Sequence, residues 1–327
     1  MSRIIGMGNA LVDVLTILES DRTLKEFDLP KGSMKLLSKE YSNRLLASTL
    51  GLQRQQSSGG SAANTIHGLA NLGMETGFVG KIGKDNLGKF FEKDLKENNI
   101  APVMFHDLDE TGRSIALISK DTERTMATFL GAAGDLHQED IDADIFKGYK
   151  YFHLEGYLVQ SRSLIRKAVR VAKAHDLIIS LDTATYNIVS ENREFLEKLI
   201  REYVDILMAN ESEAEALTGK KADTALDAMA DMAEVAVLKM GKDGSMVKRG
   251  TEKCKLGIEK VNSIDTTGAG DLYAAGFLYG YCNEQSLEVC GRIGTILGGH
   301  TTEVIGAKME EQRWDLVKEK VSKIYQA

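Results

Sequence analysis

Short apolar runs alternate along most of the chain with segments whose apolar residues recur at helical spacing. The runs apolar through several consecutive positions, as is typical of strands covered on both faces, lie at 149–158, 176–182, 204–209 and 234–240. The amphipathic helical segments that accompany them lie at 161–175, 192–203 and 211–217. This alternation predicts an α/β fold with a doubly wound, mostly parallel sheet flanked by helices. Ligands are expected at the carboxyl ends of its strands.

Two regions, 14–58 and 103–130, break this rhythm. Their strand-like runs alternate or are interrupted by polar residues, as in "GRSIALISK" and "ERTMATFL". Such patterns suit strands with one solvated face, so parts of both regions are predicted to form a small β lid over the mouth of the pocket. The chain has two prolines and no Ser- or Gly-rich linker. Residues 1–327 are therefore predicted to form a single domain.

Composition and charge narrow the class of protein. With 327 residues, of which 43% are hydrophobic, the chain can bury a substantial core. Asp plus Glu outnumber Lys plus Arg by 48 to 41 and no basic block is present, which argues against a nucleic-acid partner. The three cysteines lack CxxC spacing and no apolar stretch approaches the roughly 18 residues of a membrane span. A cytoplasmic protein with no membrane partner is expected.

The glycine motifs of the common nucleotide-binding loops are not matched. The pattern GxxxxGK[ST] fails because the Gly-Lys pairs at 80, 88, 219 and 241 are followed by Ile, Phe, Lys and Asp. The segment "GMGNAL" has Leu11 where a dinucleotide fingerprint needs Gly or Ala, and a strand-like run follows it.

The stretch "DTTGAGDLYAAGFL" (265–278) is a stronger candidate for a phosphate site. Small residues let backbone N–H groups approach a ligand closely, and the start of a helix presents unpaired donors to an anion. Asp271 falls in the first turn of the predicted helix. Taken alone, that carboxylate could simply stabilise the helix dipole.

Three segments together resemble the ribokinase-like, or PfkB, kinase family. The stretch 265–278 is similar to the family's carboxy-terminal signature, and "GGSAANTIHGLANLG" (59–73) is similar to its amino-terminal signature. Asn210 and Glu213 in "NESEAEALTG" match the family's N-x-x-E element. The three segments occur in the family's order, and the resemblance covers roughly residues 3–310.

The resemblance implies an ATP-dependent phosphotransferase that acts on an alcohol. Asp271 would take the proton from the acceptor hydroxyl. The backbone of the turn would stabilise charge on the γ-phosphoryl group through Gly268, Ala269, Gly270 and Asp271.

The resemblance also implies a nucleotide and metal site. Residues assigned to ATP binding are Asn210, Glu213, Gly241, Gly244 and, from the lid, Arg124. Glu213 would organise Mg²⁺ through water, because that ion sheds its hydration shell reluctantly. Asp265 and Thr267 match positions whose carbonyls bind a monovalent cation such as K⁺ in some members of the family.

The acceptor is read from the amino-terminal half. The segment "GNALVD" with "GGSAAN" resembles the adenosine-kinase branch, which assigns substrate binding to Asn9, Asp13, Gly59, Gly60, Ser61 and Asn64. Asp13 can accept hydrogen bonds from two neighbouring hydroxyls, as a ribose diol offers. Candidate walls for a purine are Met34, Phe129 and Tyr157.

The expected reaction transfers the γ-phosphate to a primary hydroxyl of a ribose-containing substrate, with the 5′-hydroxyl of adenosine favoured and AMP as product. A sugar kinase of ribokinase or fructokinase type is the alternative, since it would use the same two ends of the pocket. A nucleotide-binding protein without catalysis is disfavoured, because a binding module needs no base aimed at a hydroxyl. The lid pattern is compatible with a monomer or a homodimer.

Overall fold

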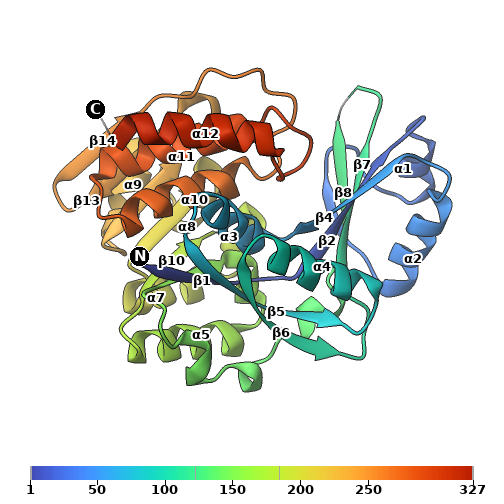
Figure 1. Ribbon diagram of the computed structural model, residues 1–327, viewed down its shortest axis with the longest axis horizontal. Coiled ribbons are helices and arrows are strands. Elements are labelled where there is room, and N and C mark those ends of the chain that lie inside the picture. The colour runs from blue at the N-terminus through green and yellow to red at the C-terminus, as the bar shows by residue number, and fades with distance from the viewer. Residues whose placement is uncertain (1, 122, 184, 326–327) are drawn as a thin grey trace.

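The computed structural model describes residues 2–121, 123–183 and 185–325, and it confirms the predicted α/β fold class (Figure 1). Its strands are β1 (Arg3–Met7), β2 (Leu11–Ile17), β3 (Met34–Leu36), β4 (Arg54–Gly59), β5 (Glu75–Gly83), β6 (Ile100–Asp107), β7 (Gly112–Ile118), β8 (Arg124–Phe129), β9 (Tyr151–Glu155), β10 (Ile178–Asp182), β11 (Ile206–Asn210), β12 (Val235–Lys239), β13 (Ser245–Arg249) and β14 (Glu252–Leu256). Its α-helices are α1 (Arg22–Glu26), α2 (Lys39–Ser48), α3 (Ser61–Asn71), α4 (Asn86–Glu97), α5 (Arg162–Ala174), α6 (Tyr186–Glu191), α7 (Arg193–Tyr203), α8 (Glu211–Thr218), α9 (Ala222–Ala230), α10 (Ala269–Cys282), α11 (Leu287–Thr301) and α12 (Glu311–Tyr325).

Within the described residues the larger sheet has nine strands, in the order β14-β13-β12-β11-β10-β9-β1-β5-β6. All pairings from β12 to β6 are parallel, and the hairpin of β13 and β14 adds antiparallel pairings at one edge. The chain extends the sheet from β1 in both directions, toward β5 and toward β9. Such a reversal opens a crevice at the carboxyl ends of the central strands.

Helices cover both faces of this sheet because successive strand residues point to opposite sides. Ile4 of β1 packs into a core formed with α3, α10, α11 and α12, whereas Ile5 packs into a second core with α5, α7, α8 and α9. Strands buried on both faces explain the continuous apolar runs of the sequence.

Glycine accounts for the close packing of α10. A β-carbon on Gly276 would lie 2.6 Å from the carbonyl oxygen of Ile293 in α11, and one on Gly68 of α3 would lie 2.7 Å from the β-carbon of Ala275. The small residues after Asp271 therefore let α10 sit tightly between α3 and α11, which fixes the position of its first turn.

The smaller sheet has the order β3-β8-β7-β2-β4 and lies beside the larger one, at the right of Figure 1. A separate core on this sheet contains Leu24 of α1, Phe27 directly after it, Leu45 of α2 and Ile115 of β7. Residues 103–107, which fall in the region predicted for the lid, belong to β6 and pair with β5 in the larger sheet.

Across the ranges that the structure describes, no helix combines the length and the apolar character needed to cross a membrane.

Candidate active site

Polar residues end the adjacent parallel strands at one edge of the larger sheet. Glu155, Asp182, Asn210 and Lys239 are the last residues of β9, β10, β11 and β12, and Asn9 follows β1 closely. All five line a cavity of about 680 Å³. The first turns of α3 and α10 and side chains of the smaller sheet complete this cavity, as the topology of the sheet predicts.

Asp271 lies in the first turn of α10 and is held by α3. Its Oδ1 accepts a hydrogen bond of 2.7 Å from the Ser61 hydroxyl, and its Oδ2 accepts one of 2.9 Å from Asn64 Nδ2. Thr65 Oγ1 donates to the backbone carbonyl of Asp271 at 3.1 Å. The two predicted signatures thus meet at one carboxylate, and Ser61, predicted to bind substrate, contacts the predicted base.

Burial raises the pKa of Asp271, while the hydrogen bonds from Asn64 and Ser61 and the charges of Lys239 and Lys308 oppose that shift. Donors aimed at both carboxylate oxygens favour the ionised form. A carboxylate that is ionised and has a raised pKa is a stronger base than a solvated one.

The turn before Asp271 offers free backbone donors. Gly268 precedes α10 with φ of 74°, and a β-carbon there would overlap Ala307. Among the described residues, no acceptor is found for the backbone N–H groups of Gly270 and Asp271. Both residues line the cavity, so the start of α10 can bind an anion there.

Asn9 and the start of α3 are tied together by Glu155, which is 1% exposed. Glu155 Oε1 accepts hydrogen bonds from Asn9 N at 2.8 Å and Asn9 Nδ2 at 2.7 Å, and Oε2 accepts one from Ala62 N at 3.0 Å. Burial raises the pKa of Glu155 to about 7, although these hydrogen bonds lower it. Glu155 therefore sets the position of Asn9 relative to Ser61.

Asp13 lies on β2 beside the glycine pair that precedes α3. A β-carbon on Gly59 would overlap the carboxylate of Asp13, and Gly60 has φ of 96°. Gly59 thus leaves room for the Asp13 carboxylate, and Gly60 has a left-handed backbone conformation that favours glycine and lines the cavity. The substrate-binding roles predicted for both glycines stay predictions. Burial raises the pKa of Asp13 to about 6, and the charges of Lys308 and Arg124 oppose that shift.

Asn210 and Glu213 form a capping box at the start of α8. Asn210 Oδ1 accepts from Glu213 N at 3.0 Å, and Glu213 Oε2 accepts from Asn210 N at 2.9 Å and from Thr183 Oγ1 at 2.7 Å. Glu213 is 4% exposed, so it is not a solvated charge on a helix face.

The donor set near Glu213 fits Mg²⁺ bound through water. Glu213 supplies a buried carboxylate, which suits an ion that keeps several waters and also binds substrate phosphates. Asp182 lies in the same cavity, and both of its oxygens accept hydrogen bonds from Lys239 Nζ. Glu213 already accepts hydrogen bonds at both oxygens, so a water-mediated contact leaves its capping role intact.

The predicted turn near the nucleotide lies between β12 and β13. Gly241 has φ of 53° and lines the cavity. Gly244 has φ of 87°, and a β-carbon there would overlap the carbonyl oxygen of Leu256 in β14. Gly244 thus serves the packing of the hairpin, while Gly241 faces the cavity.

Arg124 links the smaller sheet to the loop before α10. Its Nη2 lies 2.7 Å from Asp265 Oδ2, and its Nη1 donates to Thr267 Oγ1. Asp265 also accepts from Gly306 N at 2.6 Å. The roles predicted for Arg124 in phosphate binding and for Asp265 and Thr267 in binding a monovalent cation stay predictions.

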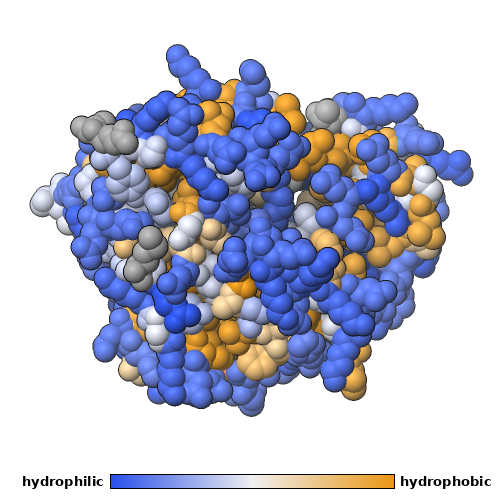
Figure 2. Space-filling view, in the orientation of Figure 1, coloured by the Kyte–Doolittle hydropathy of each residue, from blue (hydrophilic) through white to orange (hydrophobic). Residues whose placement is uncertain are grey.

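Apolar side chains line the part of the cavity that the smaller sheet provides. They are Leu11, Met34, Leu36, Met126 and Leu130. Figure 2 shows hydrophobic surface among the side chains of the smaller sheet and its helices, at the right of the view. Of the predicted wall residues, Met34 and Tyr157 line the cavity, whereas Phe129 is buried under Arg113, whose guanidinium carbon lies 5.0 Å from the ring centroid.

Four charged residues at or near this cavity were not predicted from the sequence: Glu155, Asp182, Lys239 and Lys308. The first three of them end the apolar runs "YFHLE", "IISLD" and "VAVLK". A charged residue directly after a buried strand is the pattern in the sequence that could have indicated them. Burial lowers the pKa of Lys308 to about 8, and no hydrogen-bond partner for its Nζ is found within the described ranges.

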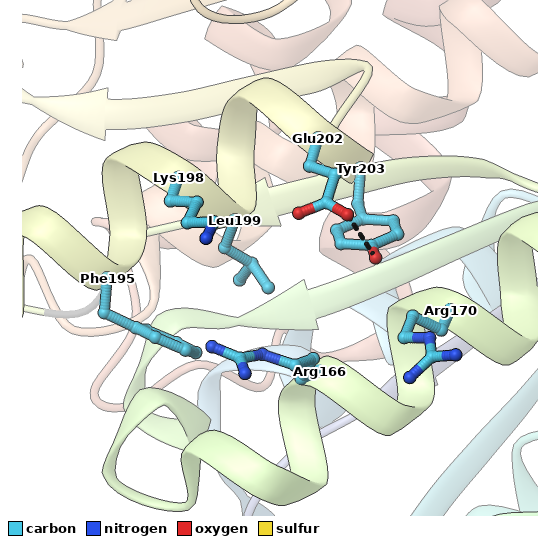
Figure 3. A pocket seen from close by; sticks show the side chains of 7 residues that line it. All are labelled: Arg166, Arg170, Phe195, Lys198, Leu199, Glu202 and Tyr203. Carbon is cyan, nitrogen blue, oxygen red and sulfur yellow. Dashed lines mark hydrogen bonds between the residues drawn. The ribbon is translucent and has the colours of Figure 1, made fainter.

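A second cavity, of about 360 Å³, lies between α5 and α7 (Figure 3). Arg166, Arg170 and Lys198 line it, and Tyr203 donates to Glu202 at 2.7 Å. None of the residues predicted to act in the reaction lies there. The chemistry is therefore assigned to the cavity at the strand ends.

Comparison with known proteins agrees with this geometry. The model of the pfkB family of carbohydrate kinases matches residues 36–312. The structure of an adenosine kinase from Sinorhizobium meliloti aligns with a TM-score of 0.88 at 33% identity, covering 98% of this chain and 99% of that one. A probable sugar kinase from Rhizobium etli CFN 42 aligns with a TM-score of 0.89 at 31% identity, covering 98% of each chain.

Another relative is named for a different substrate. The 5-dehydro-2-deoxygluconokinase of Geobacillus kaustophilus is 32% identical over 244 residues, which are 69% of this chain and 73% of that protein. These relatives are all named as kinases. The chain belongs to the pfkB family of carbohydrate kinases and is a phosphotransferase, as its motifs predicted.

Proposed function

We propose that this enzyme transfers the γ-phosphate of ATP to the 5′-hydroxyl of adenosine and releases AMP and ADP. The observation that carries the proposal is the composition of the cavity, which has Asp271 and Asp13 on its polar side and an apolar surface from the smaller sheet. A free sugar has hydroxyls on every side, whereas a nucleoside also presents an apolar base.

The polar side suits a ribose. Asp271 accepts the proton of the 5′-hydroxyl as the oxygen attacks the γ-phosphorus, and the bond between that phosphorus and the β–γ bridging oxygen breaks. Asn64 Oδ1 is buried without a hydrogen-bond partner among the described residues, so it can accept from a substrate hydroxyl. Asp13 can accept from the 2′- and 3′-hydroxyls.

The apolar side suits a nucleobase. Met34 and Leu36 are 47% and 51% exposed although they line the cavity. Covering such side chains with a flat ligand is favourable, at roughly 25 cal/mol per Å² of apolar surface removed from water. The S. meliloti adenosine kinase, at 33% identity, supports the same assignment.

The nucleotide is placed at the other end of the cavity. Its phosphates face the start of α10, and Gly241, Asn210 and Glu213 surround it. Mg²⁺ supplies charge neutralisation of the phosphates when bound, held through water by Glu213 with Asp182 nearby. Asp265 and Thr267 are proposed to bind K⁺ through their carbonyl groups.

A sugar kinase is the second candidate, favoured by the names of the R. etli and G. kaustophilus relatives. Release of ADP from ATP and Mg²⁺ is measured with adenosine, other nucleosides, ribose, fructose and 5-dehydro-2-deoxygluconate as acceptors. The proposal expects the highest kcat/KM with adenosine. Turnover of a free sugar together with inactivity on nucleosides would contradict it.

The apolar surface provides a matched test of the same choice. Met34→Lys is expected to raise the KM for adenosine by about tenfold, because a charge then faces the base. Leu50→Lys, at an exposed apolar residue outside the cavity, is the control. Equal kinetics of the two variants would argue against a nucleobase on this surface.

A further inference from the structure

The cavity at the strand ends contains a lysine that no phosphate-loop motif supplies. Among the described residues that line it, Lys239 is the only lysine or arginine. Phosphoryl transfer places negative charge on the oxygens of the transferred group, and positive groups held near those oxygens accelerate the reaction.

The Lys239 side chain is paired with the residue that ends a nearby strand, Asp182 of β10. Lys239 is the last residue of β12 and lies opposite Asn210 of β11 in the sheet register. Its Nζ donates to Asp182 Oδ1 at 2.7 Å and to Oδ2 at 2.6 Å. The side chains of Lys239 and Asp182 are 15% and 5% exposed, so water competes little for this pair.

The ammonium of Lys239 lies against the anion-binding turn. A β-carbon built on Gly270 would lie 3.4 Å from Lys239 Nζ. Gly270 and Asp271, whose backbone N–H groups have no acceptor among the described residues, line the same cavity as this ammonium. A side chain at position 270 would come close to the Lys239 ammonium. Glycine at this position therefore leaves space beside the lysine, and it also lets a ligand reach the backbone N–H groups.

Buried carboxylates accompany the Lys239 ammonium in the cavity. Asp182 and Glu213 are 4% exposed each, and both line the cavity together with Lys239. An ammonium has three donors, so one that binds Asp182 can still donate to a phosphoryl oxygen.

We propose that Lys239 is a catalytic residue that binds the terminal phosphoryl group of the nucleotide at the start of α10, and that Asp182 is the positioning residue that aims it. This inference rests on the proposed function, since it requires a nucleoside triphosphate as donor. As the bond to the leaving ADP breaks and the acceptor oxygen bonds to phosphorus, Lys239 stabilises charge on the non-bridging oxygens. Lys239 transfers no proton, and Asp271 takes the proton of the acceptor.

The test compares Lys239→Met with Lys242→Met, which removes the same charge from an exposed position in the adjoining turn. Titration calorimetry gives the affinities for ATP and ADP without an acceptor, and ADP release gives kcat. Lys239→Met is expected to lower kcat about 10²- to 10³-fold. It should weaken ATP binding by about tenfold or more, with a much smaller effect on ADP. Lys242→Met should match the wild type.

The double variant Asp182→Asn with Lys239→Met separates catalysis from charge balance, because it leaves no unpaired buried carboxylate at position 182. It is expected to fold and still to bind ATP about tenfold or more weakly than the wild type, with a much smaller effect on ADP. Wild-type ATP affinity in the double variant, or equal weakening of ATP and ADP in Lys239→Met, would overturn the proposal. Since the calorimetry needs no acceptor, a wrong acceptor assignment leaves this test intact.

Discussion

Ser61 sets the basicity of Asp271, and Ser61→Ala should make this visible in the pH dependence of the reaction. The variant removes the 2.7 Å hydrogen bond to Asp271 Oδ1 and leaves that from Asn64 to Oδ2. A hydrogen bond to a charged group contributes about 1.5–3 kcal/mol, and one pKa unit corresponds to about 1.4 kcal/mol. Because Asp271 is only half-buried, we expect the lower end, a loss of about 1.5 kcal/mol from the stability of the ionised form and hence a higher pKa.

The assay is the pH profile of kcat/KM, whose acid limb reports the essential base of the free enzyme. The base acts when ionised, so a higher pKa moves the acid limb toward neutral pH and activity is lost earlier on acidification. Thr65→Val is the matched control, because Thr65 bonds to the backbone carbonyl of Asp271 and not to its carboxylate. An unmoved acid limb in Ser61→Ala, or an equal movement in Thr65→Val, would refute this reasoning.

Three further variants test the rest of the site. Gly59→Ala places a β-carbon on the carboxylate of Asp13, so it should raise the KM for the acceptor about tenfold or more and leave the ATP affinity unchanged. Gly51→Ala is the control, because the space around Gly51 is open, and it should match the wild type. Glu155→Ala leaves the buried N–H groups of Asn9 and Ala62 unpaired, so it should lower the free energy of unfolding in urea by about 3 kcal/mol. Glu197→Ala, at an exposed ion pair, is the control. A loss in Glu155→Ala no larger than the loss in this control would contradict the role assigned to Glu155. Arg124→Lys should lower stability nearly as much as Arg124→Ala, by about 2 kcal/mol, because one ammonium cannot replace the fork to Asp265 and Thr267; full stability of the lysine variant would show that charge alone suffices.

The larger sheet and its helices could be predicted from the sequence because strands buried on both faces leave a direct hydrophobic pattern. The smaller sheet could be expected only as a region, because its strands pair across long stretches of chain. Leu11 of β2, for example, pairs with Gly112 of β7. Residues 103–107 have the same interrupted pattern as the lid strands although they lie at the edge of the larger sheet.

Site residues that lie within a family motif could be predicted from the sequence. Contacts between residues that are distant along the chain could not. Asp271 and Asn64 were found through their signatures, but the contact between Ser61 and Asp271 joins residues separated by 210 positions. Asp182 and Lys239 looked like ordinary charges at the ends of two predicted strands. Only the parallel register, which places those ends side by side, shows that they form a buried ion pair.

The central claim is that Asp271 is the base of a phosphotransferase, and Asp271→Asn tests it most directly. Asparagine has the same shape and can keep a hydrogen bond to Ser61 or Asn64, but it cannot accept the proton of the acceptor. We predict unchanged ATP affinity and single-turnover phosphoryl transfer slowed about 10²- to 10⁴-fold. Transfer within threefold of the wild-type rate, with ATP bound normally, would contradict the account.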